Sequence, residues 1–116
     1  LGGRAEFHGA LMANPWEGEV SIRLDGAAHV MKLTLGALAE LEATLGEDSL
    51  IALVERFEAG RFSTRDVLLL IVAGLRGGGW RGEASELLSA EIEGGPVEAA
   101  RLAGQLLTRA FAFPDP

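Results

Sequence analysis

Carboxylate side chains are the commonest reactive groups in this 116-residue sequence, and a pair of them is the usual acid and base of a glycosidase. They gather loosely at three places, which are Glu40 with Glu42, Glu55 with Glu58, and Glu83 with Glu86, Glu91 and Glu93. The groups that usually assist them are scarce, because the chain has two histidines, no tyrosine and a single lysine, Lys32. We therefore interpret the carboxylates as a solvated acidic surface and expect that the protein is not an enzyme.

The two histidines, His8 and His29, lie far apart in the sequence, and neither has a second histidine at the spacing of zinc ligands. Cysteine is absent, which excludes a thiolate metal site and a disulfide framework. A serine hydrolase is disfavoured as well, since no G-x-S-x-G motif is present and His29 would have to serve as the only base. The sequence thus predicts no catalytic residue and no metal site.

A glycine-rich string at residues 77–82 satisfies the pattern G-x-G-x-x-G. The dinucleotide-binding fingerprint also needs a strand before these glycines and a helix that opens directly after them. The segment before them has the character of a helix, and Trp80 would crowd a pyrophosphate. We therefore interpret the string as a helix end and a flexible connection, and expect no nucleotide cofactor.

Two strands are predicted near the start of the chain. Val20, Ile22 and Leu24 alternate with polar residues, which is the period of a half-buried strand. Asp25 and Gly26 follow, a pair that tolerates the positive φ angles of a tight turn. The alternation resumes over residues 31–35, so the sequence predicts a β-hairpin.

Helical spacing of the apolar residues dominates after the hairpin. Residues 35–45 form the first predicted helix, and Thr34 is its N-cap. Residues 50–57 form the second, with Asp48 or Ser49 as the N-cap.

Three further helices complete the prediction. Residues 63–66 resemble a capping box in front of the apolar run 67–73, which we interpret as an enclosed helix, with a buried strand as the alternative for so short a run. Residues 83–93 form an acidic helix, and residues 97–111 form the last one, behind Pro96. The predicted fold class is α+β, mainly α, with an N-terminal β-hairpin followed by about five helices.

The composition argues against several classes of protein, namely disordered, nucleic-acid-binding and membrane-spanning ones. Apolar residues make up 48% of the chain, which is too many for a disordered protein, and the formal net charge is −7. Such an acidic surface repels phosphate backbones, so nucleic-acid binding is not expected. No apolar run reaches the roughly 18 residues of a membrane span. We expect a soluble, cytoplasmic protein.

The domain organisation follows from the length and from a candidate start codon. A chain of 116 residues fits one domain. Residues 1–11 have no signal-peptide pattern and precede Met12, which looks like a native start. We expect residues 1–11 to be a tag or a disordered leader and residues 12–116 to form a single domain.

An ordered series of short segments resembles the tail family of gene transfer agents. The resemblance covers most of the chain from Met12 to about Phe111, with Trp16 where the family pattern has a polar residue. The segments that carry it are residues 12–15, 18–20, 33–42, 45–46, 57–61 and 74–79.

That family is similar to phage tail-assembly chaperones and is also described as tail tube protein. The resemblance implies a binding protein of a gene transfer agent or prophage, without catalytic residues, that acts on the tape-measure protein, the major tail protein or both. The alternative it implies is a structural tail tube subunit that is retained in the particle, which would make the protein virion-associated.

The candidate contact surface comes from the residues themselves. Trp16 and Trp80 lie in predicted loops, where a tryptophan either covers an edge of the core or anchors an interface. One core of this size does not need every apolar residue of the helices, so we expect an exposed apolar patch on the stripe 97–111. It would bind a helical segment of a partner or a second copy of the chain. The candidate partner-binding residues are Trp16, Trp80, Leu102, Leu106 and Phe111.

Overall fold

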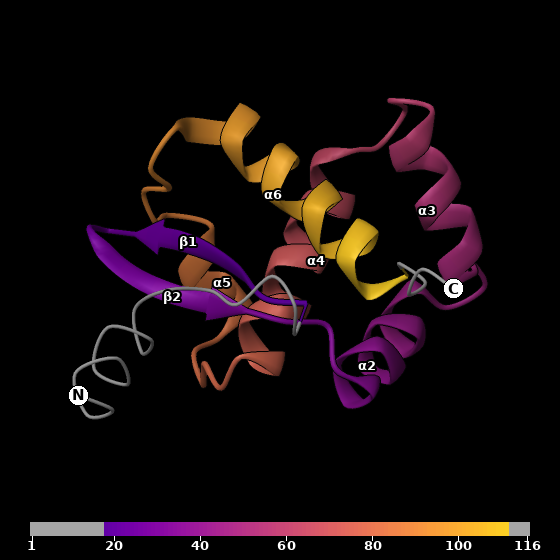
Figure 1. Cartoon of the computed structure of the whole chain (residues 1–116), viewed down its shortest axis with the longest axis horizontal. Coiled ribbons are helices and arrows are strands. Elements are labelled where there is room, and N and C mark those ends of the chain that lie inside the picture. Colours follow the sequence, from indigo (N-terminus) through magenta and orange to yellow (C-terminus); the bar gives the residue numbers. More distant parts are fainter. Residues whose placement is uncertain (1–17, 112–116) are drawn as a thin grey trace, which may run out of the picture.

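The computed structural model describes residues 18–111, in which a two-stranded hairpin is followed by five helices (Figure 1). This confirms the predicted α+β, mainly α class. The expected leader, residues 1–11, lies outside the described residues. The elements are β1 (Val20–Leu24), β2 (Ala27–Met31), α2 (Leu35–Leu45), α3 (Leu50–Glu58), α4 (Thr64–Gly77), α5 (Ala84–Leu87) and α6 (Gly95–Ala110).

The hairpin is closed by a two-residue turn. Asp25 and Gly26 adopt positive φ angles of 50° and 84°, and Leu24 pairs directly with Ala27. The prediction of a second strand over residues 31–35 is therefore wrong, because a two-residue turn starts β2 at once. β2 ends at Met31, and four residues later α2 begins.

Side-chain caps begin the first three helices. Thr34 Oγ1 accepts from the backbone N–H of Ala37 at 3.1 Å, and Ser49 Oγ accepts from Ala52 at 2.9 Å. The predicted capping box at residues 63–66 is confirmed, since Ser63 Oγ and the Asp66 carboxylate each accept the other's backbone N–H. The capping residues in the sequence therefore predicted the starts of these three helices correctly.

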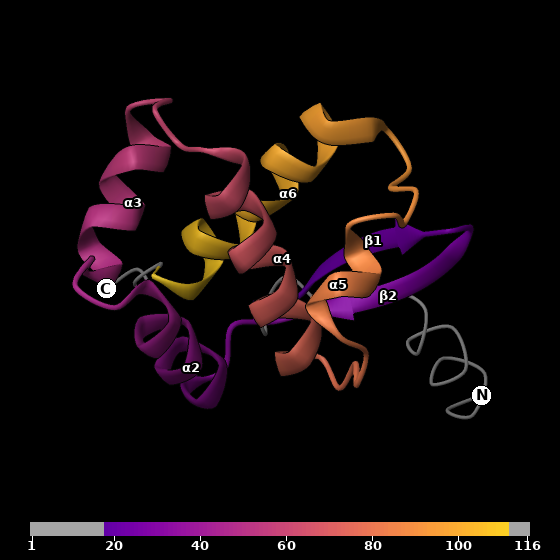
Figure 2. The same cartoon turned by 180° about the vertical axis from the view of Figure 1, so that it is seen from behind.

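Helix α4 is the central element of the core. Leu70, Ile71 and Leu75 are almost completely buried, and α4 packs against α2, α6 and β2. In both views α4 runs through the middle of the molecule, with α2 and α3 to one side of it and the hairpin with α5 to the other (Figures 1 and 2). The prediction of an enclosed helix over residues 67–73 is confirmed, and the alternative of a buried strand is excluded.

The glycines at the end of α4 permit a close approach to β2. A Cβ atom on Gly77 would lie 1.8 Å from the carbonyl oxygen of Lys32, and one on Gly78 would lie 1.9 Å from that of Val30. Gly79 then takes a φ of 105°, which turns the chain away. The glycine-rich string is thus a helix end and a connection, as predicted, and not the opening of a helix after a strand.

The acidic segment after α5 differs from its prediction. The expected helix over residues 83–93 is limited to Ala84–Leu87, because the chain beyond it runs along β1 instead. The N–H of Asp25 donates to the carbonyl of Glu91 at 2.8 Å, and the N–H of Glu93 donates to the carbonyl of Arg23 at 3.1 Å. Pairing with a free strand edge satisfies these backbone groups and replaces continuation of the helix.

Candidate docking groove

The apolar residues of α6 divide between two faces of the helix. Leu102, Ala103 and Leu106 are buried against the core, where α6 packs on α4. The expectation that Leu102 and Leu106 belong to an exposed patch is therefore wrong, since only 5% and 1% of their surfaces are accessible. Residues three and four apart lie on one face of a helix, and α4 covers that face.

The second face of α6 carries two exposed apolar side chains. Val97 is 82% exposed and Phe111 is 41% exposed, and the N–H of Phe111 still donates to the carbonyl of Leu107 in helical fashion. Val97, Gly104 and Phe111 follow one another at intervals of seven residues, which is within about 20° of two full turns. They therefore form a nearly straight line on the side of α6 that α4 does not cover.

Helix α3 forms the opposite wall, together with the loop that follows it. Leu53 is fully buried and anchors α3, whose main helix contact is with α2. Farther along α3, the ring of Phe57 stacks on that of Phe62 with centroids 4.5 Å apart. The stacked pair presents an aromatic surface toward α6, because both rings line the space between the two helices.

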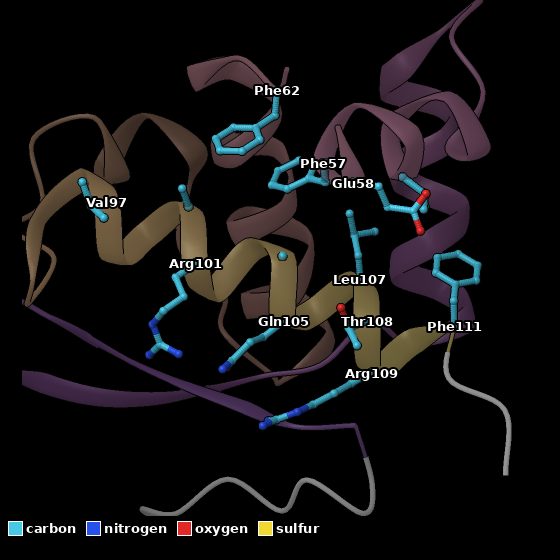
Figure 3. A pocket seen from close by; sticks show the side chains of 13 residues that line it. Phe57, Glu58, Phe62, Val97, Arg101, Gln105, Leu107, Thr108, Arg109 and Phe111 are labelled. Atoms are coloured by element: carbon cyan, nitrogen blue, oxygen red, sulfur yellow. The ribbon is translucent and has the colours of Figure 1, made fainter. Parts of the chain in front are cut away.

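An open groove of about 1040 Å³ lies between these walls (Figure 3). The rings of Phe57 and Phe62 stand over α6, and Val97 and Phe111 lie toward its two ends. Arg101, Gln105 and Arg109 also line the space but point to the other side of α6 (Figure 3). The remaining lining residues are Val54, Glu58, Ala100, Gly104, Leu107 and Thr108.

A bidentate ion pair fixes the end of α3 near the start of α4. Arg56 donates from Nε and Nη2 to the two carboxylate oxygens of Asp66, each at 2.9 Å, while Asp48 lies 3.6 Å from Nη1. The hydrogen bonds from Arg56 lower the pKa of Asp66, against the opposing effect of burial, and the N–H of Ser63 lowers it further. The same contact raises the pKa of Arg56. The wall of the groove is thus held by a charged clamp at one point.

The guanidinium groups on the outer side of α6 have partners within the chain. Arg101 donates to both carboxylate oxygens of Glu98, at 2.9 and 2.6 Å, and this lowers the pKa of Glu98. Arg109 donates to the backbone carbonyl of Glu19 and so ties α6 to the segment that enters β1. Both cations line the groove but are directed to the other side of α6 (Figure 3), and the line of Val97, Gly104 and Phe111 is uncharged.

The structure places one of the two predicted tryptophans. Trp80 is half-buried and packs against the edge of the core beside the glycine string, which fits the core-covering interpretation. Trp16 lies outside the described residues. Phe111 remains as the predicted contact residue that lines the groove. Val97 begins the predicted stripe 97–111 but was not among the predicted contact residues, and neither was Gly104, although their seven-residue spacing to Phe111 was a signal that pointed to both.

The described residues offer no cluster suited to metal chemistry. Among residues 18–111, no three histidine, cysteine or acidic side chains come together in a way that could hold a metal ion. In the late acidic group, Glu86 is occupied in accepting the backbone N–H of Glu83 at 3.1 Å, which caps α5. No helix in this part of the chain is long and apolar enough to cross a membrane.

A comparison with protein families finds a match that spans both walls of the groove. The family model described as phage tail tube protein, GTA-gp10, matches residues 17–113. No curated protein matches the chain, and no solved structure matches it either.

Proposed function

The chain belongs to the family described as phage tail tube protein, GTA-gp10, and on that premise we propose that it is a tail-assembly chaperone-like binding protein. Its role is connected with the tail of a phage or gene transfer agent. In this proposal it acts in the cytoplasm on the tape-measure protein and on tail subunits, and it performs no catalysis. The proposal places it at the stage when these subunits are still unassembled.

The open groove between α3 and α6 is the observation that supports a binding role. Its lining is mainly apolar, its length follows α6, and it exposes Val97 and Phe111 to solvent. Grooves of this kind accept an amphipathic helix, which lays its apolar face against the floor. A long helical protein such as a tape measure exposes many such faces before assembly. The groove therefore has the form that a holding protein for helical segments needs.

The acidic charge fits the same role. A formal net charge of −7 opposes aggregation and attracts segments that carry basic residues. The groove itself is apolar, so charge would guide a partner while apolar contact would hold it. Binding of a basic client is then expected to weaken as salt concentration rises.

The alternative is a structural tube subunit that stays in the particle. Tube subunits are normally built on a large sheet whose strands close a ring. The described residues contain a single two-stranded sheet, and one edge of it is partly covered by residues 91–93. This arrangement favours the chaperone proposal over the alternative.

Co-expression with the tape-measure protein tests the proposal. The wild-type chain should keep the tape measure in the soluble fraction and should be recovered with it in a pull-down. Thr108→Glu, which places a charge on the exposed floor of the groove, should reduce both yields. Leu88→Glu is the matched control, because Leu88 is also exposed but lies outside the groove.

Two results would reject the chaperone role. One is a wild-type chain that neither binds nor solubilises the tape measure. The other is recovery of the protein from purified particles in amounts equal to the tail tube subunit, which would favour the structural alternative instead.

A further inference from the structure

The two edges of the β-hairpin have different surroundings. Along the β1 edge, residues 91–93 lie as a short extended segment and form backbone hydrogen bonds with Arg23 and Asp25. Along the β2 edge, the described residues place no further strand, because the sheet consists of β1 and β2 alone. The hairpin is thus extended on one side and open on the other.

The register shows which backbone groups of β2 face the open side. The carbonyl of Arg23 points away from β2, toward Glu93, so Arg23 does not share ladder hydrogen bonds with Ala28, the residue opposite it. The same holds two positions along, where Ser21 lies opposite Val30. Because such pairs alternate with hydrogen-bonded ones, Ala28 and Val30 direct their N–H and C=O groups outward.

The end of α4 covers only one part of this open side. Lys32 donates its N–H to the carbonyl of Gly74 at 2.9 Å, and the carbonyl of Val30 lies against Gly78. The N–H of Val30 and both backbone groups of Ala28 have no hydrogen-bond partner in the part of the chain that the structure describes. In both views the turn end of the hairpin extends beyond α4 (Figures 1 and 2). A stretch of unpaired strand edge therefore remains between the turn and α4.

The sequence of β2 does not protect this stretch against pairing. Edge strands of natural proteins commonly carry a charged side chain, a proline or a bulge, each of which prevents another strand from adding. β2 contains no Lys, Arg, Asp, Glu or Pro, and it pairs with β1 residue by residue without a bulge. His29 lies opposite the buried Ile22 and so on the core-facing side of the hairpin. The edge can therefore accept another extended segment.

Unpaired positive charge gathers where β2 meets α4. Lys32, Arg76 and Arg81 belong to two stretches of the chain, residues 26–39 and 67–82, that contain no Asp or Glu. None of the three cations has an ion-pair partner among the described residues. The first carboxylates beyond them, in α5, are occupied in its capping box. This end of an otherwise acidic molecule is thus suited to an acidic partner.

The β1 edge shows what kind of segment the hairpin accepts. Residues 91–93 read Glu-Ile-Glu. Ile92 forms a bridge with Leu24 and packs against the core, whereas the Glu93 carboxylate lies 3.8 Å from Nε of Arg23. Successive side chains of an extended segment point to opposite faces, so acidic and apolar residues in alternation satisfy both faces of this hairpin.

We propose that the open edge of β2 binds an extended segment of a partner chain, in which acidic and apolar residues alternate, as an added strand. Ala28 exchanges two hydrogen bonds with this segment and Val30 donates a third. Its carboxylates are attracted by Lys32, Arg76 and Arg81. Pairing of two β2 edges would instead bring the same cations of two copies together, so charge favours the acidic partner over a second copy.

This contact is separate from the groove and does not rest on the proposed chaperone function. It involves few residues, so we expect an isolated peptide to bind with a dissociation constant on the order of 0.1–1 mM. Added salt should weaken the binding, because the cations are near the surface.

Nuclear magnetic resonance of the full chain with a synthetic peptide tests the proposal. The probe is Glu-Val-Glu-Val-Glu-Val, blocked at both ends. The amides of Ala28 and Val30 should exchange rapidly in the free chain, and the peptide should shift their signals and slow their exchange several-fold. The amide of His29, which is bonded within the hairpin, should be protected throughout. Two control peptides, one with Lys in place of Glu and one with N-methylated valines, should bind at least tenfold more weakly.

Variants of the chain locate the contact. Ala28→Pro removes an outward N–H that the hairpin does not use, which edge strands tolerate, and should weaken binding at least tenfold. Ala28→Ser keeps this N–H and should bind like the wild type. Arg76→Glu should weaken binding several-fold, whereas Arg65→Glu makes the same charge change at the other end of α4 and should have no effect.

Each outcome supports or overturns the proposal. Unchanged signals of Ala28 and Val30 at about ten times the expected dissociation constant overturn it. Equal binding of the lysine peptide or of the N-methylated peptide overturns it as well, since the contact would then depend on neither charge nor strand pairing. Slow exchange of both amides before peptide is added would mean that this chain or a second copy already covers the edge.

If circular dichroism shows that Ala28→Pro does not fold, the N-methylated peptide decides on strand pairing with the wild-type chain. None of these measurements includes the tape-measure protein. Their failure therefore leaves the proposed chaperone function standing, and failure of the co-expression test leaves the edge site standing.

Discussion

Helix α6 carries apolar side chains on two of its faces, and the two faces have different neighbours. On one side, Leu102 and Leu106 fit against α4 with almost no exposed surface. On the other, Val97 and Phe111 face an open groove whose far wall, α3, is anchored mainly by Leu53 and by the clamp between Arg56 and Asp66. Apolar character alone therefore does not distinguish core from contact surface. The position of the neighbouring helix does.

The largest expected effect is on the buried side of α6. Leu106→Ala should lower the free energy of unfolding by about 2–5 kcal/mol, because it leaves a cavity against α4. Val97→Ala, on the same helix, should change it by less than about 0.5 kcal/mol, as is usual for exposed positions. Urea denaturation of both variants measures the difference. Equal losses would show that the groove side is also part of the core.

The contact between α4 and β2 provides the next test, away from α6. Gly78→Ala places a methyl group against the carbonyl oxygen of Val30, so the backbone must move, at a cost of about 1–3 kcal/mol. Gly36→Ala is the matched control, because a Cβ atom there would meet only Thr34 Oγ1 at 3.9 Å. The control should keep or slightly raise the melting temperature, since alanine is the better helix former. A Gly78→Ala variant as stable as the wild type would contradict the close approach.

The clamp on α3 should show a smaller effect with a defined pH dependence. Asp66→Asn should cost about 1–2 kcal/mol, because it weakens both a helix cap and a charged hydrogen bond. The pKa of Asp66 is lowered in the folded chain, so the stabilisation is complete above the unfolded pKa of about 4 and is lost as the pH falls below it. Acid titration of stability should therefore be less steep in the variant.

Hydrogen exchange adds a local measurement to this prediction. Amides of α3 should exchange faster in Asp66→Asn, while those of α4 around Leu70 should keep their protection. Glu98→Gln is the control, since its ion pair with Arg101 is exposed and should contribute little. Uniformly faster exchange would mean that the clamp supports the whole fold and not the groove wall.

The smallest effect concerns the centre of the groove. Gly104→Ala should stabilise the isolated chain by up to about 1 kcal/mol, because alanine is the better residue within a helix. Thermal melts of the variant and the wild type measure this effect. If the variant were less stable as a monomer, glycine would be a requirement of the fold.

Sequence patterns predicted the features that depend on neighbouring residues. The caps at Thr34 and Ser63, the turn at Asp25 and Gly26, and the enclosed helix over residues 67–73 are all local, and all are confirmed. The errors concern contacts between distant segments. Residues 91–93 pair with β1 instead of continuing a helix, and nothing near them in the sequence indicates that strand.

The candidate site was also predicted only in part, because it too depends on contacts between distant segments. The stripe over residues 97–111 was correctly recognised as apolar, yet spacing alone could not tell which side α4 would cover. Leu102 and Leu106 were therefore predicted as contact residues, while Val97, the first residue of the stripe, was not. Phe111 is the one predicted contact residue that lines the groove, and its role toward a partner stays a prediction.

The burial of α4 under α6 has a consequence for the order of synthesis. Leu70 and Leu75 leave the ribosome well before Leu106, which covers the same region, and Arg109 reaches back to the carbonyl of Glu19. The nascent chain must therefore present the α6-facing side of α4 uncovered until α6 has been translated. We expect folding of this domain to be completed only after α6 has left the exit tunnel, and truncated chains that lack α6 to be captured by ribosome-associated factors or degraded.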